Sequence, residues 1–416
     1  MMERVLTQPR VLLFYLSQML YPTPERFLLI HDFPLSTSLW QPWTTLPAIL
    51  FWLAWLAAGL LLAAKRPLIA FSLLFFLVNH AIESSILPLE MVFEHRNYLP
   101  SMTLYLLVGI GIIALLRDFS PKPQVRAVVA SAAVVVIALQ GVAVVYRNSL
   151  FHHEVRFWAD NARKAPELSR VHTNLGNAYQ RIGLQEKARA AYEAARDADR
   201  FHRADLESVP YNNLGNYRLR HGELAEAKAN YQQALAIDPR RKTAIVGLSI
   251  SLLVLGELDA ARPVLADGLE HYPQDTGLLT LHAVLLLREG RYREAIAEAQ
   301  KVLTLDPGPN NAFKVLGEAH MRLAEYRTAK RFWQTYADAN PGDLEAALAL
   351  LEIADRQDDP AGLRRAAEHL ETLRKSRSWE ELFALIDQRS DMKLLLRTSP
   401  WELLPLIRRG LADQAG

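Results

Sequence analysis

The chain has 416 residues, of which 50% are apolar and 22% are charged, with a formal net charge of +2 and no cysteine. This near-neutral balance lacks the basic excess that is typical of nucleic-acid-binding proteins, so we expect no nucleic acid partner. The absence of cysteine excludes disulfides, thiolate metal sites and a cysteine nucleophile. The average combines two different halves, because residues 43–146 carry few charges whereas the chain from Arg147 onward is rich in Ala, Leu, Glu and Arg.

The first segment, residues 1–42, contains a short apolar stretch at residues 11–20. A helix needs about 20 apolar residues to cross a bilayer, so this stretch is too short to span. Arg4 and Arg10 precede it as in a signal peptide, but no small-residue cleavage site follows. We therefore expect an interfacial or re-entrant helix here.

Residues 43–146 are predicted to form a membrane domain of about four transmembrane helices. Each of its apolar segments approaches the length that a spanning helix requires, and helices satisfy every backbone polar group in lipid. The segments are 43–64, 67–82, 99–116 and 125–145.

The short loops between these segments predict their orientation. Lys65 and Arg66 join the first pair, and Arg117, Lys122 and Arg126 flank the connection between the third and fourth. In an up-and-down arrangement both loops lie on one side, which the excess of Lys and Arg marks as cytoplasmic. Residues 1–42, the 83–98 loop and everything after residue 146 are then expected outside the cytoplasm.

The second half of the chain is built from repeats. The motif Asn-Leu-Gly-Asn begins at Asn174 and again at Asn213, after which marker positions recur every 34 residues. The small-residue markers are Ala227, Ala261, Ala295 and Ala329, and the helix-ending markers are Pro239, Pro273, Pro307 and Pro341. A 34-residue helix–turn–helix period is the signature of tetratricopeptide repeats. The expected fold is all-α: polytopic membrane helices, then a superhelical solenoid of about five repeats plus half-repeats at 147–375, with capping helices at 376–416.

The concave surface of such an array is the expected binding site for a polypeptide ligand. Its candidate contacts are amide side chains and an apolar patch, namely Asn174, Asn177, Asn213 and Asn216, and Ile250 and Leu253 with their neighbours Val246 and Val254. Amides can both donate to and accept from a peptide backbone. The alternative is that the Asn side chains bond neighbouring turns and that curvature buries the apolar set.

A second candidate site lies in the outward loop between the second and third membrane segments. Glu90 and Glu94 are four residues apart and would share a helix face, beside His95. Arg96 has the geometry to hold a phosphate, and the outward His31-Asp32 pair could meet this cluster. The alternative is that these charges end helices and extend to water. No metal site is expected.

The succession RVLTQPRVLLFYLSQMLYP, HDFPLSTSL and PLEMVFEHRNYLPS, followed by a membrane helix pair and repeats, resembles one family. It is similar to the C-terminal part of GT-C-type membrane protein O-glycosyltransferases with tetratricopeptide repeats, whose animal members are transmembrane O-mannosyltransferases acting on cadherins and whose relatives occur in bacteria. The resemblance implies a bacterial inner-membrane protein, a polyprenyl-phosphate sugar donor and repeats that present an acceptor polypeptide. The resemblance also implies that Glu94, His95, Arg96, His31 and Asp32 belong to the wall of the site that faces the lipid-linked sugar donor, here called the donor side.

The family's acidic catalytic motif, in its first outer loop, has no counterpart here, so no catalytic residue is assigned and no cofactor is evident. Three interpretations therefore stay open. The chain is part of an enzyme, truncated or completed by a separate membrane subunit; or a non-catalytic adaptor for envelope protein assembly; or a small independent enzyme. The expected partners are a polypeptide, the lipid bilayer and, for the first interpretation, that separate subunit.

Overall fold

The computed structural model describes residues 2–31, 33–81, 92–118, 122–198, 204–375, 377–388 and 399–412, and the regular structure in these ranges is helical. The chain divides into two compact units, Met1–Arg200 and Phe201–Gly416. We describe each unit by itself.

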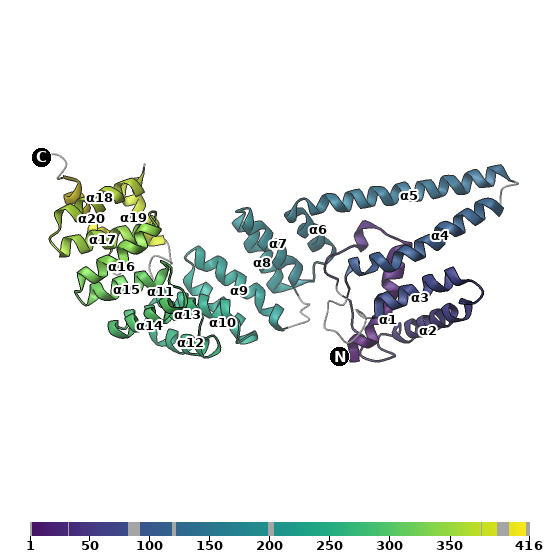
Figure 1. Cartoon of the computed structure of the whole chain (residues 1–416), viewed down its shortest axis with the longest axis horizontal. Helices are drawn as coiled ribbons and strands as arrows, with labels where there is room; N and C mark the ends of the chain where they lie inside the picture. Colours follow the sequence, from purple (N-terminus) through teal and green to yellow (C-terminus); the bar gives the residue numbers. More distant parts are fainter. Residues whose placement is uncertain are drawn as a thin grey trace. The chain divides into compact units, whose positions relative to one another are not determined.

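The first unit combines apolar helices with the first helices of the repeat region (Figure 1). In chain order its helices are α1 Met2–Leu20, the 3-10 helix η1 Pro24–Arg26, α2 Thr45–Leu62, α3 Pro67–Ala81, the 3-10 helix η2 Glu94–Asn97, α4 Tyr98–Asp118, α5 Pro123–Phe151, α6 Glu154–Lys164, α7 Ser169–Arg181 and α8 Gln185–Asp197.

Three of these helices are long and apolar enough to cross a membrane: α2, α4 and α5. The fourth predicted span corresponds to α3, which has 15 residues within the described part of the chain and is shorter than a spanning helix needs. Residues 82–91, which contain the end of that predicted span, lie outside the described residues. By length and composition the described residues therefore contain three candidate spans, and the fourth span stays a prediction.

Helix α1 begins at Met2, before the apolar stretch that the sequence marks, and packs among the apolar helices. Its buried Val11 and Tyr15 share a core with Trp52 of α2 and Phe76 of α3. The indole nitrogen of Trp52 donates to the backbone oxygen of Pro9, 2.8 Å away. One face of α1 is thus covered by protein.

Residues 24–31, here called the strap, connect α1 to the repeat helices of the same unit. At the α1 side, the amide nitrogen of Gln18 donates to the backbone oxygen of Arg26 at 2.8 Å. At the other side, the backbone N–H of Leu29 donates to Asn161 Oδ1 at 3.0 Å, and Lys164 Nζ donates to the oxygen of Pro24 at 2.8 Å. The strap therefore fastens α6 to α1.

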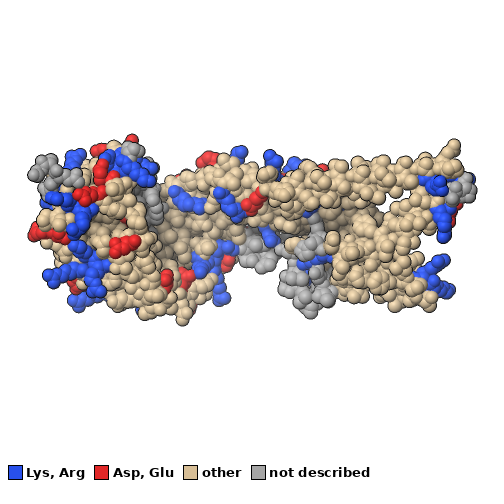
Figure 2. All heavy atoms as spheres, turned by 45° about the horizontal axis from the view of Figure 1, so that its top comes forward, with Lys and Arg blue, Asp and Glu red and all other residues tan. Residues whose placement is uncertain are grey.

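The end of α2 and the start of α3, and the end of α4 and the start of α5, lie at one end of the apolar helices, opposite α6 (Figure 1). Figure 2 shows Lys and Arg side chains gathered at this end, separated from the repeat helices by an uncharged surface. The two connections and their flanks carry Lys65, Arg66, Arg117, Lys122 and Arg126. Both basic loops therefore share one end of this unit.

The second unit is a row of helical hairpins followed by two further helices (Figure 1). Its helices are α9 Ala204–Arg220, α10 Leu224–Ile237, α11 Lys242–Leu255, α12 Leu258–His271, α13 Thr276–Arg288, α14 Tyr292–Leu305, α15 Asn311–Arg322, α16 Tyr326–Ala339, α17 Leu344–Arg356, α18 Pro360–Arg374, α19 Trp379–Gln388 and α20 Pro400–Ala412.

These helices confirm the 34-residue period. The four marker alanines are fully buried, and each marker proline lies two residues beyond the end of α10, α12, α14 or α16. Proline is suited to that position because it cannot continue a helix. At the end of the predicted array, α17 pairs with α18, and α20, in the predicted capping region, packs on both of them.

Packing explains the glycine of the Leu-Gly motif. A Cβ added at Gly215 would lie 2.7 Å from the ring of Tyr231, and one added at Gly247 would lie 2.2 Å from the same ring. The fully buried ring of α10 thus rests against glycines of α9 and α11. A larger residue at Gly215 would push α9 away from α10 within one hairpin, and a larger residue at Gly247 would push α11 of the next hairpin away.

Candidate functional site

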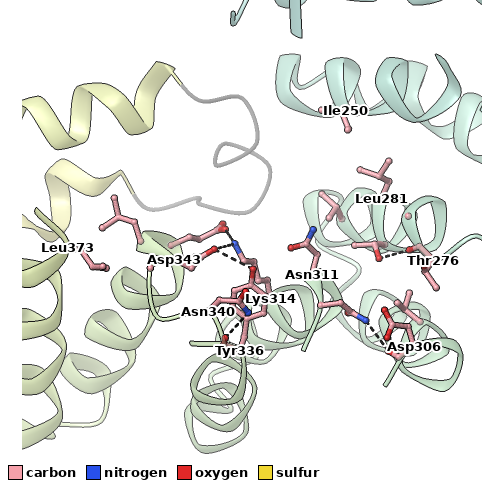
Figure 3. Close-up of a pocket in the computed structure, with 18 of the residues that line it drawn as sticks. Ile250, Thr276, Leu281, Asp306, Asn311, Lys314, Tyr336, Asn340, Asp343 and Leu373 are labelled. Carbon is pink, nitrogen blue, oxygen red and sulfur yellow. Dashed lines mark hydrogen bonds and ion pairs between the residues drawn. The ribbon is translucent and has the colours of Figure 1, made fainter. Parts of the chain in front are cut away.

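The second unit contains a cavity of about 1150 Å³, here called the groove, lined by α11, α13, α15, α17 and the end of α18 (Figure 3). Its lining side chains occupy equivalent positions of successive repeats. One series is Val246, Thr280 and Lys314, another is Gly277, Asn311 and Glu345, and a third is Ile250 and Val284, each spaced by 34 residues. The groove is therefore formed by the same positions of consecutive repeats, which face inward along the array.

The chemistry of the groove changes along these series. At the α11 and α13 end the lining is mainly apolar, with Val246, Ile250, Leu281 and Val284 beside the hydroxyls of Thr276 and Thr280. At the α15 and α17 end the lining carries charged and amide groups, among them Asn311, Lys314, Asp343 and Glu345. An extended ligand in this groove would therefore meet an apolar surface at one end and a charged surface at the other.

Three charged side chains form the groove floor at the charged end, and we call them the floor triad. Lys314 Nζ lies 2.7 Å from Asp343 Oδ2 and 2.6 Å from Glu345 Oε2 (Figure 3). The Lys314 ammonium also lies 4.9 Å from the centre of the Tyr336 ring. Asp343 Oδ1 accepts from the backbone N–H of Ala346, so the same carboxylate caps α17. The N-terminal turn of α17 thus positions both acids.

The floor triad is largely withdrawn from water, with side-chain exposures of 10% for Lys314, 20% for Asp343 and 3% for Glu345. Burial raises the pKa of the Glu345 carboxyl to about 7, although the Lys314 ammonium acts in the opposite direction. For Lys314, burial disfavours the charge, but the Glu345 and Asp343 carboxylates outweigh it and hold the pKa above its usual value. The ammonium therefore stays charged while Glu345 titrates near neutral pH.

Three amides that the sequence motifs do not single out line the groove, namely Asn310, Asn311 and Asn340. Asn311 opens α15 and is exposed, and Asn340 precedes Pro341 at the end of α16. The 34-residue register could have found Asn311, because it is equivalent to Gly277 and Glu345.

The predicted Asn174, Asn177, Asn213 and Asn216 are half-buried on α7 and α9 and lie outside this groove lining. Asn177 Oδ1 lies 2.8 Å from the hydroxyl of Tyr192, and Asn216 Oδ1 accepts from the hydroxyl of Tyr231 at 2.8 Å. In both hairpins the amide oxygen thus serves to join the first helix to the second.

The two predicted apolar groove residues, Ile250 and Leu253, lie in different environments in the structure. Ile250 lines the groove as expected. Leu253 does not, because it lies on another side of α11 and is fully buried in the core. The structure therefore places Leu253 in the core rather than in the groove lining, because three residues rotate the helix by about 300°, which is not onto the same line of contact.

The outer-loop candidates are described only in part. Asp32 and Glu90 lie outside the described residues, and the side chains of Glu94 and His95 are not described. His31 packs against the Phe14 ring with 5.3 Å between centroids, and the Arg96 guanidinium lies 5.6 Å from the Phe93 ring.

Helix α1 relates the two predicted donor-side segments. The hydroxyl of Tyr15 accepts from the backbone N–H of Phe93 at 2.7 Å, while the neighbouring Phe14 contacts His31. The Asn97 side-chain amide donates to the backbone oxygen of Tyr15 at 3.4 Å. Both segments therefore contact adjacent residues of α1.

In the described part of the chain, no group of three His, Cys, Asp or Glu side chains is placed to hold a metal ion.

Comparison with known proteins identifies the repeats. Models of the tetratricopeptide repeat match residues 167–240, 218–285 and 280–326. Residues 167–326 thus form an all-α array of tetratricopeptide repeats. These matches do not include residues 4–101, on which the glycosyltransferase resemblance rests, and that resemblance stays a prediction.

Two curated proteins are similar to part of the chain. The transcription factor tau 131 kDa subunit of Saccharomyces cerevisiae is 28% identical over 109 residues, which are 26% of this chain and 11% of that protein. The SGT1 homolog of Oryza sativa subsp. japonica is 34% identical over 100 residues, which are 24% of this chain and 27% of that protein. The chain thus spans a minor part of the length of both relatives.

Among solved structures, YrrB, described as a tetratricopeptide-repeat protein with an unusual peptide-binding site, is 22% identical. The match covers 44% of this chain and 92% of YrrB, with a TM-score of 0.37.

Proposed function

We propose that this chain is a membrane-anchored interaction scaffold whose groove holds an extended segment of a partner polypeptide. The observation that carries the proposal is the groove of the second unit, a cavity of about 1150 Å³ that crosses successive repeats and presents apolar, amide and charged side chains. Sites with mainly apolar walls and a few placed polar groups are typical of ligand recognition. Repeat arrays use such extended surfaces to bind partners.

Membrane anchoring is supported by the surface of the apolar helices. Helix α5 has 29 residues and none of them is buried, and α4 buries only Pro100 and Leu104. An apolar surface of this extent is unfavourable in water and is expected to face lipid or another protein. The shared basic end of the unit would then be cytoplasmic, with the repeats outside the cytoplasm.

Site-specific photocrosslinking tests the groove. A benzophenone amino acid at Ile250 should form an adduct with a polypeptide in native membranes, and mass spectrometry should place that adduct at position 250. The substitution Asn311→Trp places a bulky ring at an exposed position of the groove lining and should lower the yield several-fold. The same amino acid at Glu270, exposed on α12 and outside the lining, is the control. Equal yields with and without Asn311→Trp would contradict the proposal.

Cysteine labelling tests the topology, and the natural chain is suited to it because it contains no cysteine. In bacterial spheroplasts, an impermeant maleimide should label Glu270→Cys but not Lys65→Cys or Arg126→Cys. A permeant maleimide should label all three. Labelling of Lys65→Cys from outside would contradict the proposed orientation, and recovery of the chain in the soluble fraction would contradict the anchor.

A second candidate function is participation in protein O-glycosylation from a polyprenyl-phosphate sugar. It is favoured by the contacts that α1 makes with both donor-side segments, through Phe14 to His31 and through Tyr15 to the stretch that contains Arg96. On this hypothesis Arg96 holds the lipid phosphate and the groove presents the acceptor. A transfer assay in proteoliposomes, with and without candidate membrane subunits, tests it. Wild-type activity in an Arg96→Ala variant would remove Arg96 from that role.

A further inference from the structure

The floor triad carries more negative than positive charge. Asp343 and Glu345 share the single ammonium of Lys314, so the three groups sum to one negative charge when both acids are ionised. Glu318 is also buried nearby, but its Oε1 accepts from Arg322 Nε at 2.7 Å and so has its own cation. The excess charge therefore belongs to the floor triad itself.

Glu345 supplies an independent observation. Its side chain is 3% exposed and lines the groove, and its Oε1 is buried without a hydrogen-bond partner. A buried carboxylate oxygen without a donor is destabilising, because it has lost its hydrogen bonds to water and has gained no other. The missing partner is a hydrogen-bond donor, and while both acids are ionised the excess negative charge favours a cationic donor over a neutral one.

Two other cations line the groove, Lys375 and Arg377, in the segment that follows α18. Both are exposed, so water and salt screen them. Charges in the buried floor act through a lower effective dielectric and are stronger at the same distance. The floor therefore dominates the selection at this end of the groove, although the exposed pair would by itself favour an acidic residue.

We propose that the charged end of the groove is a subsite for a basic residue of the bound polypeptide, whose ammonium or guanidinium pairs with Glu345 and Asp343. This subsite rests on the proposed peptide-binding function and specifies its ligand: an apolar residue on Val246, Ile250 and Leu281, followed along the chain by a lysine or arginine. Asp343, the most exposed member of the floor triad, marks the entry by which the cation reaches the carboxylates.

The test begins with selection of random dodecapeptides displayed on phage against the full chain in nanodiscs. Wild-type protein should enrich peptides with an apolar residue and a lysine or arginine. Glu345→Gln protein should lose the basic enrichment while keeping the apolar one. Glu270→Gln, which neutralises an exposed carboxylate outside the groove, is the matched control and should select as wild type does.

A peptide-side change then separates the subsite from any effect on folding. In the best selected peptide, arginine is replaced by citrulline, which has a similar shape but no charge (or lysine by norleucine). This change should weaken binding to wild type about tenfold, as expected for a hydrogen bond to a charged group, and should have little effect on binding to Glu345→Gln. Fluorescence anisotropy measures both dissociation constants.

The outcomes distinguish the two levels of the proposal. Peptides that depend on the groove, as shown by loss of binding to Asn311→Trp, but carry no basic residue or an acidic one would overturn the subsite and leave the peptide-binding function standing. An equal citrulline effect in both proteins would also overturn it. Selection of no groove-dependent peptide would remove the proposed function and the subsite with it.

Discussion

Helices α5 and α13 are both strongly apolar, yet they have opposite relations to the rest of the protein. No residue of α5 is buried, whereas most residues of α13 are buried between neighbouring hairpins. Length separates them, because 29 residues span about 43 Å and 13 residues about 20 Å at 1.5 Å per residue, against about 30 Å of hydrocarbon. A helix that is apolar on all sides thus has two solutions, lipid or a protein core, and the covering elements decide between them.

The largest expected difference between the two environments concerns a matched pair of leucines. Leu253 of α11 is fully buried, and Leu139 of α5 is 64% exposed. Leu253→Ala should lower the free energy of unfolding of the repeats by about 3.5 kcal/mol, from lost burial and a residual cavity. Leu139→Ala should change it by less than about 0.5 kcal/mol. Urea denaturation followed by hydrogen exchange of the α10–α13 peptides measures both, and equal effects would break the comparison.

A charge placed in α5 tests the other side of the comparison. Val136 is 52% exposed in the middle of α5. If this surface faces lipid, Val136→Arg should cost about 3 kcal/mol of membrane insertion, because the guanidinium must leave water. Carbonate-resistant membrane fractions quantify the loss, with Val136→Leu as the control. An arginine variant retained as fully as the leucine variant would mean that α5 does not face hydrocarbon.

A smaller effect is expected from proton binding at Glu345. Its folded-state pKa of about 7 lies above the ordinary value of 4.5, so the folded protein binds this proton more tightly than the unfolded chain. The resulting stabilisation is full below about pH 4.5 and is lost as the pH rises through about 7. Relative to Glu345→Gln, wild type should lose on the order of 2 kcal/mol of unfolding free energy between pH 4.5 and 8.

Denaturant titrations of the two proteins across this pH range measure that difference. Glu270→Gln serves as the control, because Glu270 is exposed and lies outside the groove. A constant difference between wild type and Glu345→Gln would show that the Glu345 carboxyl keeps an ordinary affinity for its proton.

The smallest expected effects come from the two tyrosine–amide contacts, one in each unit. Asn216→Ala removes the acceptor of the Tyr231 hydroxyl and should cost about 1 kcal/mol. Asn177→Ala should cost less, because the Tyr192 hydroxyl also lies 2.8 Å from Gln180 Oε1. Combining each change with tyrosine to phenylalanine completes a double-mutant cycle. A larger loss for Asn177→Ala would contradict this ranking.

The repeat half was largely predictable because its physical constraints recur at a fixed spacing. Alanines at close crossings and prolines beyond helix ends act locally, so their period located the hairpins α10 to α16. The apolar segments were equally visible as composition. Whether α3 spans a membrane was not, because its 15 described residues fall short of the length that composition suggested.

The groove was harder to predict because it depends on which side of each helix faces inward. Ile250 and Leu253 look equivalent in composition, yet one lines the groove and the other fills the core. The floor triad joins Lys314 to acids in the next hairpin, about 30 residues away, and no local motif marks such a pair. Comparing Glu345 with its repeat equivalents Gly277 and Asn311 would have singled it out.

The strap has a mechanical consequence for the first unit. Helix α6 is joined to the apolar helices twice: covalently through α5, and through the hydrogen bonds that residues 24–31 make with Asn161 and Lys164. The Arg147 guanidinium, near the end of α5, donates a hydrogen bond to the backbone oxygen of Phe27 at 2.9 Å. This bond connects α5 directly to the strap. A pulling load on α7 and α8 is therefore shared by two parallel paths, and the base of the array resists twisting as well as stretching.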